Sequence, residues 1–333
     1  MRLSVRKVNG INIALLIVSA LVAFRFPLET FLGAYAFLGP LHYLTEISWL
    51  EQKRYFLPSK QWIFGLVCLC AFVFPLGYLF VKVATVSMVA VTIAFLGSGL
   101  FLYVKQQKIA WFLLLAGSAV LAASFYASLT VLRSVELVAV LLPTLVHVGL
   151  FTGLFMLSGA LREKRWSELG LVTFSFFVLC AIGLFVSGGW FSSWGASAGM
   201  RPLYSAFYGV NETVLRWFTS NAPMSVRLFD SALGLGLMRC IAFVYLYHYL
   251  NWFSKTSIIQ WHVVSRRRVV AILCIWIITI GVYLVDYRVG FLALYFLSLL
   301  HVFLEFPLNW KTLVQLPRLV KQRFFLYSKV EGA

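Results

Sequence analysis

The sequence predicts an all-α protein, a polytopic bundle of about ten transmembrane helices. Of its 333 residues, 62% are hydrophobic and only 12% are charged, and the mean hydropathy is +0.90. This balance is typical of an integral membrane protein, because a soluble domain so poor in charge would aggregate. Many apolar runs also reach the roughly 20 residues that a helix needs to cross about 30 Å of hydrocarbon.

The expected spans follow one another closely, and no repeat or low-complexity linker divides them. They cover residues 9–26, 29–50, 61–80, 84–104, 109–131, 135–160, 169–188, 231–253, 269–286 and 290–307. One polytopic membrane domain over residues 1–333 is the simplest interpretation. The first run lacks a small-residue cleavage site followed by a polar mature domain, so we interpret it as a retained helix.

The distribution of lysine and arginine supports this topology. With the N-terminus in the cytoplasm, 20 basic residues fall in cytoplasmic segments, 7 fall in external segments, and Arg239 lies within a span. The bias alternates from loop to loop and places both termini in the cytoplasm. We expect the membrane to be the inner membrane of a bacterium. The net charge of +17 therefore indicates topology and membrane-lipid contact, and we expect no nucleic-acid partner.

The longest external segment, residues 189–230, contains "YSAFYGVNETVLRWF". Its aromatic side chains recur on one side of a helical pattern, which predicts an extracytoplasmic segment with an interfacial helix.

Ionisable residues inside the expected spans point to a function. Such groups are costly in a bilayer and usually face the bundle interior with partners. We therefore expect a carboxylate or carbonyl partner for Arg239, whereas His262 lies in a basic loop and is expected to be solvated. The candidate functional residues are the four histidines and two glutamates in the second, sixth, eighth and tenth spans: His42, Glu46, His147, His248, His301 and Glu305.

The depth of the four histidines can be compared, because all four spans run from outside to inside. Counting to the cytoplasmic end at about 1.5 Å per residue puts His42, His248 and His301 roughly 8, 5 and 6 residues from it. His147 is deeper, at about 13 residues, or fewer if its span ends early. Three histidines thus share a level in the cytoplasmic leaflet, and Pro40 is expected to break the helix one turn before His42.

Two of the histidines are followed by glutamate four residues later, on the same helical face. In His42–Glu46 and His301–Glu305, both side chains can ligate one metal, or the carboxylate can orient the imidazole. With His147 and His248, this set suits iron, manganese or zinc, and such ligands with open positions are usual for non-haem iron and O₂ chemistry. Two alternatives are structural His–Glu hydrogen bonds between helices and a path for protons or solute.

Four short motifs carry a resemblance to a known family. They are "GPLHYLTE" with His42, "VHVGLF" with His147, "YLYHYLNWF" with His248, and "LHVFLEFPLN" with His301. Their order resembles the Brp/Blh family of membrane β-carotene dioxygenases, in which an acid follows the first and last histidine by four residues. This chain has glutamate where the family has aspartate, and Trp252 stands where the second histidine of the family's pair falls.

The resemblance and the residues together imply an iron-dependent membrane oxidoreductase of the dioxygenase type. Non-haem iron or another divalent transition metal would be the cofactor, and a carotenoid, another isoprenoid or a lipid would be the apolar substrate, entering from the bilayer. The four histidines would be metal ligands, and Glu46 and Glu305 would be ligands with catalytic roles in proton handling. The alternatives are a non-enzymatic membrane subunit or scaffold and a proton-coupled transporter, although no internal repeat supports a transporter.

Overall fold

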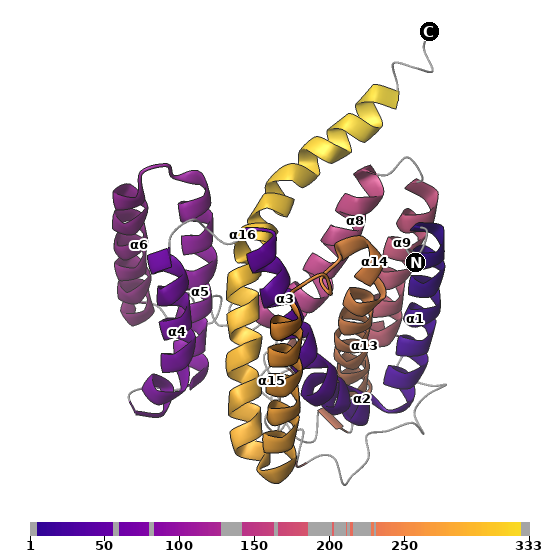
Figure 1. Cartoon of the computed structure of the whole chain (residues 1–333), viewed down its shortest axis with the longest axis horizontal. Coiled ribbons are helices and arrows are strands. Elements are labelled where there is room, and N and C mark those ends of the chain that lie inside the picture. Colours follow the sequence, from indigo (N-terminus) through magenta and orange to yellow (C-terminus); the bar gives the residue numbers. More distant parts are fainter. Residues whose placement is uncertain are drawn as a thin grey trace. The chain divides into compact units, whose positions relative to one another are not determined.

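The computed structural model describes residues 5–55, 60–79, 83–127, 142–162, 166–185 and 231–327, with positions 202, 211, 214–215 and 228–229. In these ranges every regular element is a helix and no strand occurs, so the predicted all-α class is confirmed (Figure 1). The expected interfacial helix within residues 189–230 falls almost wholly outside the described residues.

Five of the described helices are long and apolar enough to cross a membrane. They are Arg6–Arg25, Leu145–Arg162, Ala232–Ser254, Arg266–Val285 and Val289–Arg323, and four shorter apolar stretches accompany them. The helix Arg266–Val285 exposes large apolar side chains along most of its length, as lipid-facing helices do. These features identify a membrane protein, while the count of ten spans and the side on which the termini lie stay predictions.

The chain folds into two compact units. The first comprises Met1–Leu38, Val148–Val263 and Lys311–Ala333, and the second comprises Gly39–His147 and Val264–Trp310.

Helix α13 (Ala232–Ser254) lies at the centre of the first unit. It packs against α1 (Val5–Arg25), α2 (Pro27–Gly33) and α9 (Trp166–Phe185), and α9 also packs against α8 (Thr152–Arg162). Ser231 caps the start of α13, where its hydroxyl accepts a hydrogen bond from the amide of Gly234. The fully buried Arg239 donates from Nε to the carbonyl of Phe24 at 3.0 Å, so its expected backbone partner is confirmed.

The second unit contains α3 (Gly39–Gln52), α4 (Lys60–Leu79), α5 (Val83–Tyr103), α6 (Gln107–Ala127), α15 (Arg266–Val285) and the first part of α16 (Tyr287–Tyr327). Helix α5 packs against α4 and α6, and α3 packs against α15. Two glycines of α5 let bulky rings approach, since a Cβ at Gly97 would overlap Trp62 and one at Gly99 would overlap Trp310. The Trp310 indole also donates to the carbonyl of Phe95 at 2.8 Å, which fixes α16 against α5.

Two departures from the prediction involve proline. The last helix was expected to end at residue 307, but α16 extends over 41 residues to Tyr327, through Pro307 and Pro317 (Figure 1). The expected break at Pro40 is also wrong, because a π-helical turn, η1 (Ala34–Leu38), leads directly into α3. The wider π turn accommodates a residue that lacks an N–H and crowds the preceding carbonyl, so the helix continues.

Candidate metal centre

Three helical segments bring five ionisable side chains of the second unit to one buried place. Helix α3 supplies His42 and Glu46, the π-helical segment η2 (Leu142–Phe151) supplies His147, and α16 supplies His301 and Glu305. Each of these five residues is at most 4% exposed. Burial this complete requires that the groups satisfy one another or bind something else.

The five side chains make a chain of close contacts. His42 Nε2 lies 3.0 Å from Glu46 Oε2, and His147 Nδ1 lies 3.2 Å from Glu305 Oε2. His147 Nε2 and His301 Nε2 are 3.2 Å apart. The His42 and His147 rings stand at 78° and 75° to the His301 ring, with centroids 5.5 and 5.0 Å from it. The His301 imidazole is therefore shared between the side chains of α3 and η2.

Three of these residues form a group that could hold a metal ion. His42, Glu46 and His301 each offer one ligand atom, and these atoms all lie within 4.8 Å of one another. Two imidazole nitrogens that bind one ion at about 2.0–2.1 Å are themselves about 3.0–3.4 Å apart at ordinary ligand angles. The 3.2 Å between His147 Nε2 and His301 Nε2 is compatible with that spacing and equally with a hydrogen bond, so His147 adjoins the group without being one of its three members.

Each of the two glutamates has a carboxylate oxygen that accepts no hydrogen bond of proper geometry from the described part of the chain. Glu46 Oε2 and Glu305 Oε2 are buried, and neither accepts a hydrogen bond in proper geometry from any described residue. The two carboxyl groups also interact with each other, although each comes from a different helix. Two charged carboxylates in an apolar interior would repel strongly, so either a proton shared between them or a cation bound beside them would stabilise the arrangement.

A tyrosine holds the central histidine in place. The Tyr43 ring stacks on the His301 imidazole with centroids 4.2 Å apart and planes at 22°. Tyr43 is 1% exposed, so its ring cannot move without disturbing the packing between α3 and α16. On the helix itself, the His301 ring also interacts with the backbone at Leu297 and Ser298. Contacts of this kind fix the orientation of a ligating imidazole.

The π-helical segments explain how two of the histidines reach the group. The η1 turn ends four residues before His42, and His147 itself lies within η2. A π turn rotates the following side chains relative to a regular α-helix, and such turns recur at functional sites.

The structure brings together five of the six predicted site residues and changes their pairing. His42 contacts Glu46 of its own helix, as predicted, whereas Glu305 contacts His147 and not His301. His147 was expected to lie deeper than the others, but it contacts His301 directly. A residue count to the end of a span gives only a depth, and it does not show which side chains of neighbouring helices meet.

The sixth predicted residue, His248, belongs to the first unit. Its Nδ1 lies 2.7 Å from the hydroxyl of Thr152, a partner for which the sequence offers no signal. Its role as a metal ligand stays a prediction. The exposed position of His262 in the loop before α15 confirms the expectation that this histidine is solvated.

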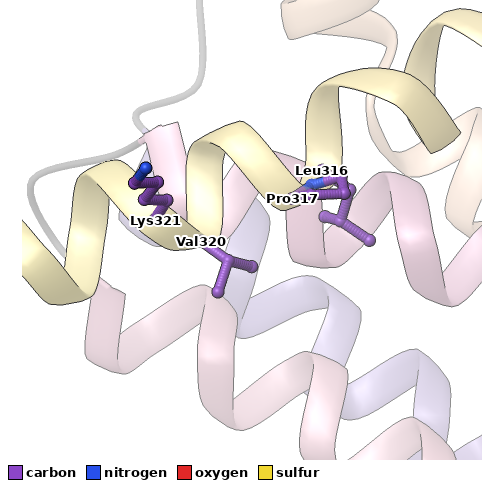
Figure 2. A pocket seen from close by; sticks show the side chains of 4 residues that line it. All are labelled: Leu316, Pro317, Val320 and Lys321. Carbon is purple, nitrogen blue, oxygen red and sulfur yellow. The ribbon is translucent and has the colours of Figure 1, made fainter.

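A pocket elsewhere on the chain has a different character. It lies on the C-terminal part of α16, in the first unit, and is lined by Leu316, Pro317, Val320 and Lys321 (Figure 2). Its lining is apolar apart from one amine and offers no metal ligand.

Fold and site together define a class: a helical membrane protein with a buried histidine–glutamate group that could hold a metal ion. No family model matches the chain, and neither a curated protein nor a solved structure matches it.

Proposed function

We propose that this chain is a membrane metalloenzyme, an oxygenase with non-haem iron that oxidises an apolar isoprenoid or lipid. The observation that carries the proposal is the convergence of three imidazoles and two carboxylates at one buried place in the second unit. The mixture of nitrogen and carboxylate donors suits iron, and the resemblance to the Brp/Blh family favours iron and a carotenoid-like substrate.

The position of each of the five residues suggests its role in binding the metal or in handling protons. His42, Glu46 and His301 would hold the ion, and His147 would donate a further nitrogen. Glu305, which contacts His147, would balance the positive charge and hold or release a proton beside the reacting atoms. The bound metal would supply the activation of O₂.

The surroundings of the site favour an apolar substrate. Residues on both helices that carry the ligands, including Leu50 of α3 and Phe303 and Phe306 of α16, belong to one buried apolar cluster.

Addition of O₂ across a carbon–carbon double bond with cleavage to two carbonyl groups is balanced without a reductant. A dioxygenase at this site therefore needs no electron-donor partner.

Metal analysis of the detergent-purified protein tests the proposal. The wild type and the His262→Ala control, whose histidine is exposed, should each carry about one equivalent of metal. The His301→Ala and Glu46→Gln variants should lose most of it, because each removes a donor that the described group cannot replace. Less than about a tenth of an equivalent in the wild type after reconstitution with iron would refute the metal centre.

The same assay addresses His248. If this histidine supplies a ligand, His248→Ala lowers the metal content while Thr152→Val, which removes only its hydrogen-bond partner, has a smaller effect. Equal metal content in wild type and His248→Ala would limit its role to the contact with Thr152.

Oxygen uptake by the reconstituted protein tests the reaction itself. Carotenoid or shorter isoprenoid polyenes in lipid nanodiscs should stimulate O₂ consumption by the iron-loaded wild type and not by His301→Ala. Carbonyl products should form in a ratio of two per O₂ consumed if the reaction is a double-bond cleavage.

A scaffold is the second candidate, favoured by one observation. His42 and Glu46 lie at hydrogen-bond distance within a single helix, where they could be a local structural pair. On this reading, His42→Ala lowers stability and leaves metal content unchanged. A proton-coupled transporter, the third candidate, draws on the adjacent Glu46 and Glu305 carboxyl groups and predicts a pH-dependent flux in vesicles.

We also propose that anionic membrane lipids contact the C-terminal part of α16. Between residues 306 and 330 the chain has five basic residues and no acidic one. Arg318 and Lys321 are exposed there, and Lys321 borders the apolar pocket of Figure 2. A basic and apolar surface of this kind fits lipid headgroups at a cytoplasmic membrane face.

A further inference from the structure

Asn309 is a buried polar residue that the proposed metal centre leaves unexplained. It lies on α16 one turn after Glu305, it is 0% exposed, and neither atom of its amide has a hydrogen-bond partner among the described residues. The adjacent Trp310, in contrast, donates its indole N–H to Phe95 and accepts at its carbonyl from Tyr103. A fully buried amide that finds no partner in the described part of the chain is costly and calls for an explanation.

Asn309 lies on the side of α16 that carries the residues of the metal group. His301, Glu305 and Asn309 are spaced at four residues each, so they form one stripe along the same face of α16. Side chains on a helix tilt toward its N-terminus, which for Asn309 is the direction of Glu305. The amide of Asn309 therefore continues the row of polar side chains on α16 one turn beyond Glu305.

The Asn309 amide differs from the neighbouring carboxylates because it also carries hydrogen-bond donors. A cation can be bound by the carboxylate oxygens of Glu46 and Glu305, but it repels the two N–H donors of the Asn309 amide. Those donors require an acceptor atom. A ligand on the metal that carries an oxygen or nitrogen lone pair satisfies the donors and the cation together.

We propose that Asn309 is a binding residue for the small exogenous ligand of the metal, a water, hydroxide or small anion. The Nδ2 group donates a hydrogen bond to this ligand, and Oδ1 accepts one when the ligand carries a proton. The proposal rests on the metal centre proposed above and adds to it a hydrogen-bonding subsite.

Azide binding to the full-length protein in detergent tests the subsite. The protein is loaded with Co²⁺, whose visible absorption reports the ligands of the ion, and azide is the probe. Asn309→Leu should keep its Co²⁺ and bind azide about tenfold more weakly, since a hydrogen bond to a charged acceptor is lost. Asn309→Ala, which cannot clash, should show the same weakening if the leucine variant fails to fold.

Asn251→Leu is the matched control. Asn251 is also a buried asparagine in a long helix, with an Oδ1 that has no hydrogen-bond partner among the described residues, but it lies on α13 of the first unit. Its variant should bind azide like the wild type.

The outcomes separate the two proposals. Unchanged azide affinity in both Asn309 variants, with full Co²⁺ occupancy, overturns the subsite and leaves the metal centre standing. Loss of Co²⁺ from the Asn309 variants overturns the subsite as well, because the residue then helps to hold the ion. A wild type that binds no Co²⁺ overturns both.

Discussion

The stack of Tyr43 on His301 predicts that metal affinity depends on an aromatic ring that is not itself a ligand. Replacement of Tyr43 by leucine removes the ring whose centroid lies 4.2 Å from the imidazole and leaves His301 able to rotate. A ring pair of this kind contributes about 0.5–1.5 kcal/mol beyond simple burial. Since 1.4 kcal/mol corresponds to a factor of ten, Tyr43→Leu should weaken metal binding by roughly 2- to 13-fold.

The assay is a competition for the metal between the purified protein and a chromophoric chelator, which gives the dissociation constant directly. Tyr43→Phe keeps the ring and should stay within about twofold of the wild type. Tyr35→Leu is the control for general loss of core packing, because Tyr35 is also buried but stacks on Phe31 at 5.9 Å. Equal affinities for Tyr43→Leu and Tyr43→Phe would refute the idea that the stack positions His301.

Two further predictions concern packing and surface charge. Gly99→Ala should lower the free energy of unfolding by about 1–3 kcal/mol, because its Cβ would lie 2.8 Å from the Trp310 ring. Gly117→Ala, which meets open space, should be neutral or stabilising by up to about 1 kcal/mol, and thermal unfolding in detergent compares the two. The ion pair of Arg268 with Glu51 is 2.9 Å long, but its side chains are 38% and 55% exposed. Arg268→Ala should therefore cost no more than about 1 kcal/mol and less at high salt, and a larger loss that is insensitive to salt would contradict this estimate.

The helices were largely predictable because the bilayer imposes a length on apolar segments. The expected spans 61–80 and 84–104 agree with α4 (Lys60–Leu79) and α5 (Val83–Tyr103) to within a residue. The last span shows the limit of this reasoning, since hydropathy reports where the apolar run ends and not where the helix ends. Beyond residue 307 the chain becomes basic, yet its leucine, lysine, glutamine and valine residues let the helix continue.

The members of the site were predictable, but their partners were not. The cost of burying a charge singles out His42 and Glu305 in an apolar run, whatever they contact. The four-residue spacing shows that two side chains share a face, but it does not show which neighbouring helix that face meets. This is why Glu305 was paired with His301 in the sequence, whereas in the structure its carboxylate contacts His147.

The contacts among the buried imidazoles and carboxylates bear on whether this group is a metal centre or a set of structural His–Glu hydrogen bonds between helices. A His–Glu staple between helices satisfies itself, because each imidazole N–H finds a carboxylate oxygen. In this group three imidazoles meet two carboxylates, and the Nε2 atoms of His147 and His301 face each other at 3.2 Å. One shared proton could satisfy that pair, while the contacts of His42 with Glu46 at 3.0 Å and of His147 with Glu305 at 3.2 Å lack the geometry of proper hydrogen bonds. A cation does not need hydrogen-bond geometry: held by His42, Glu46 and His301, it would satisfy one carboxylate oxygen and two imidazole nitrogens at once.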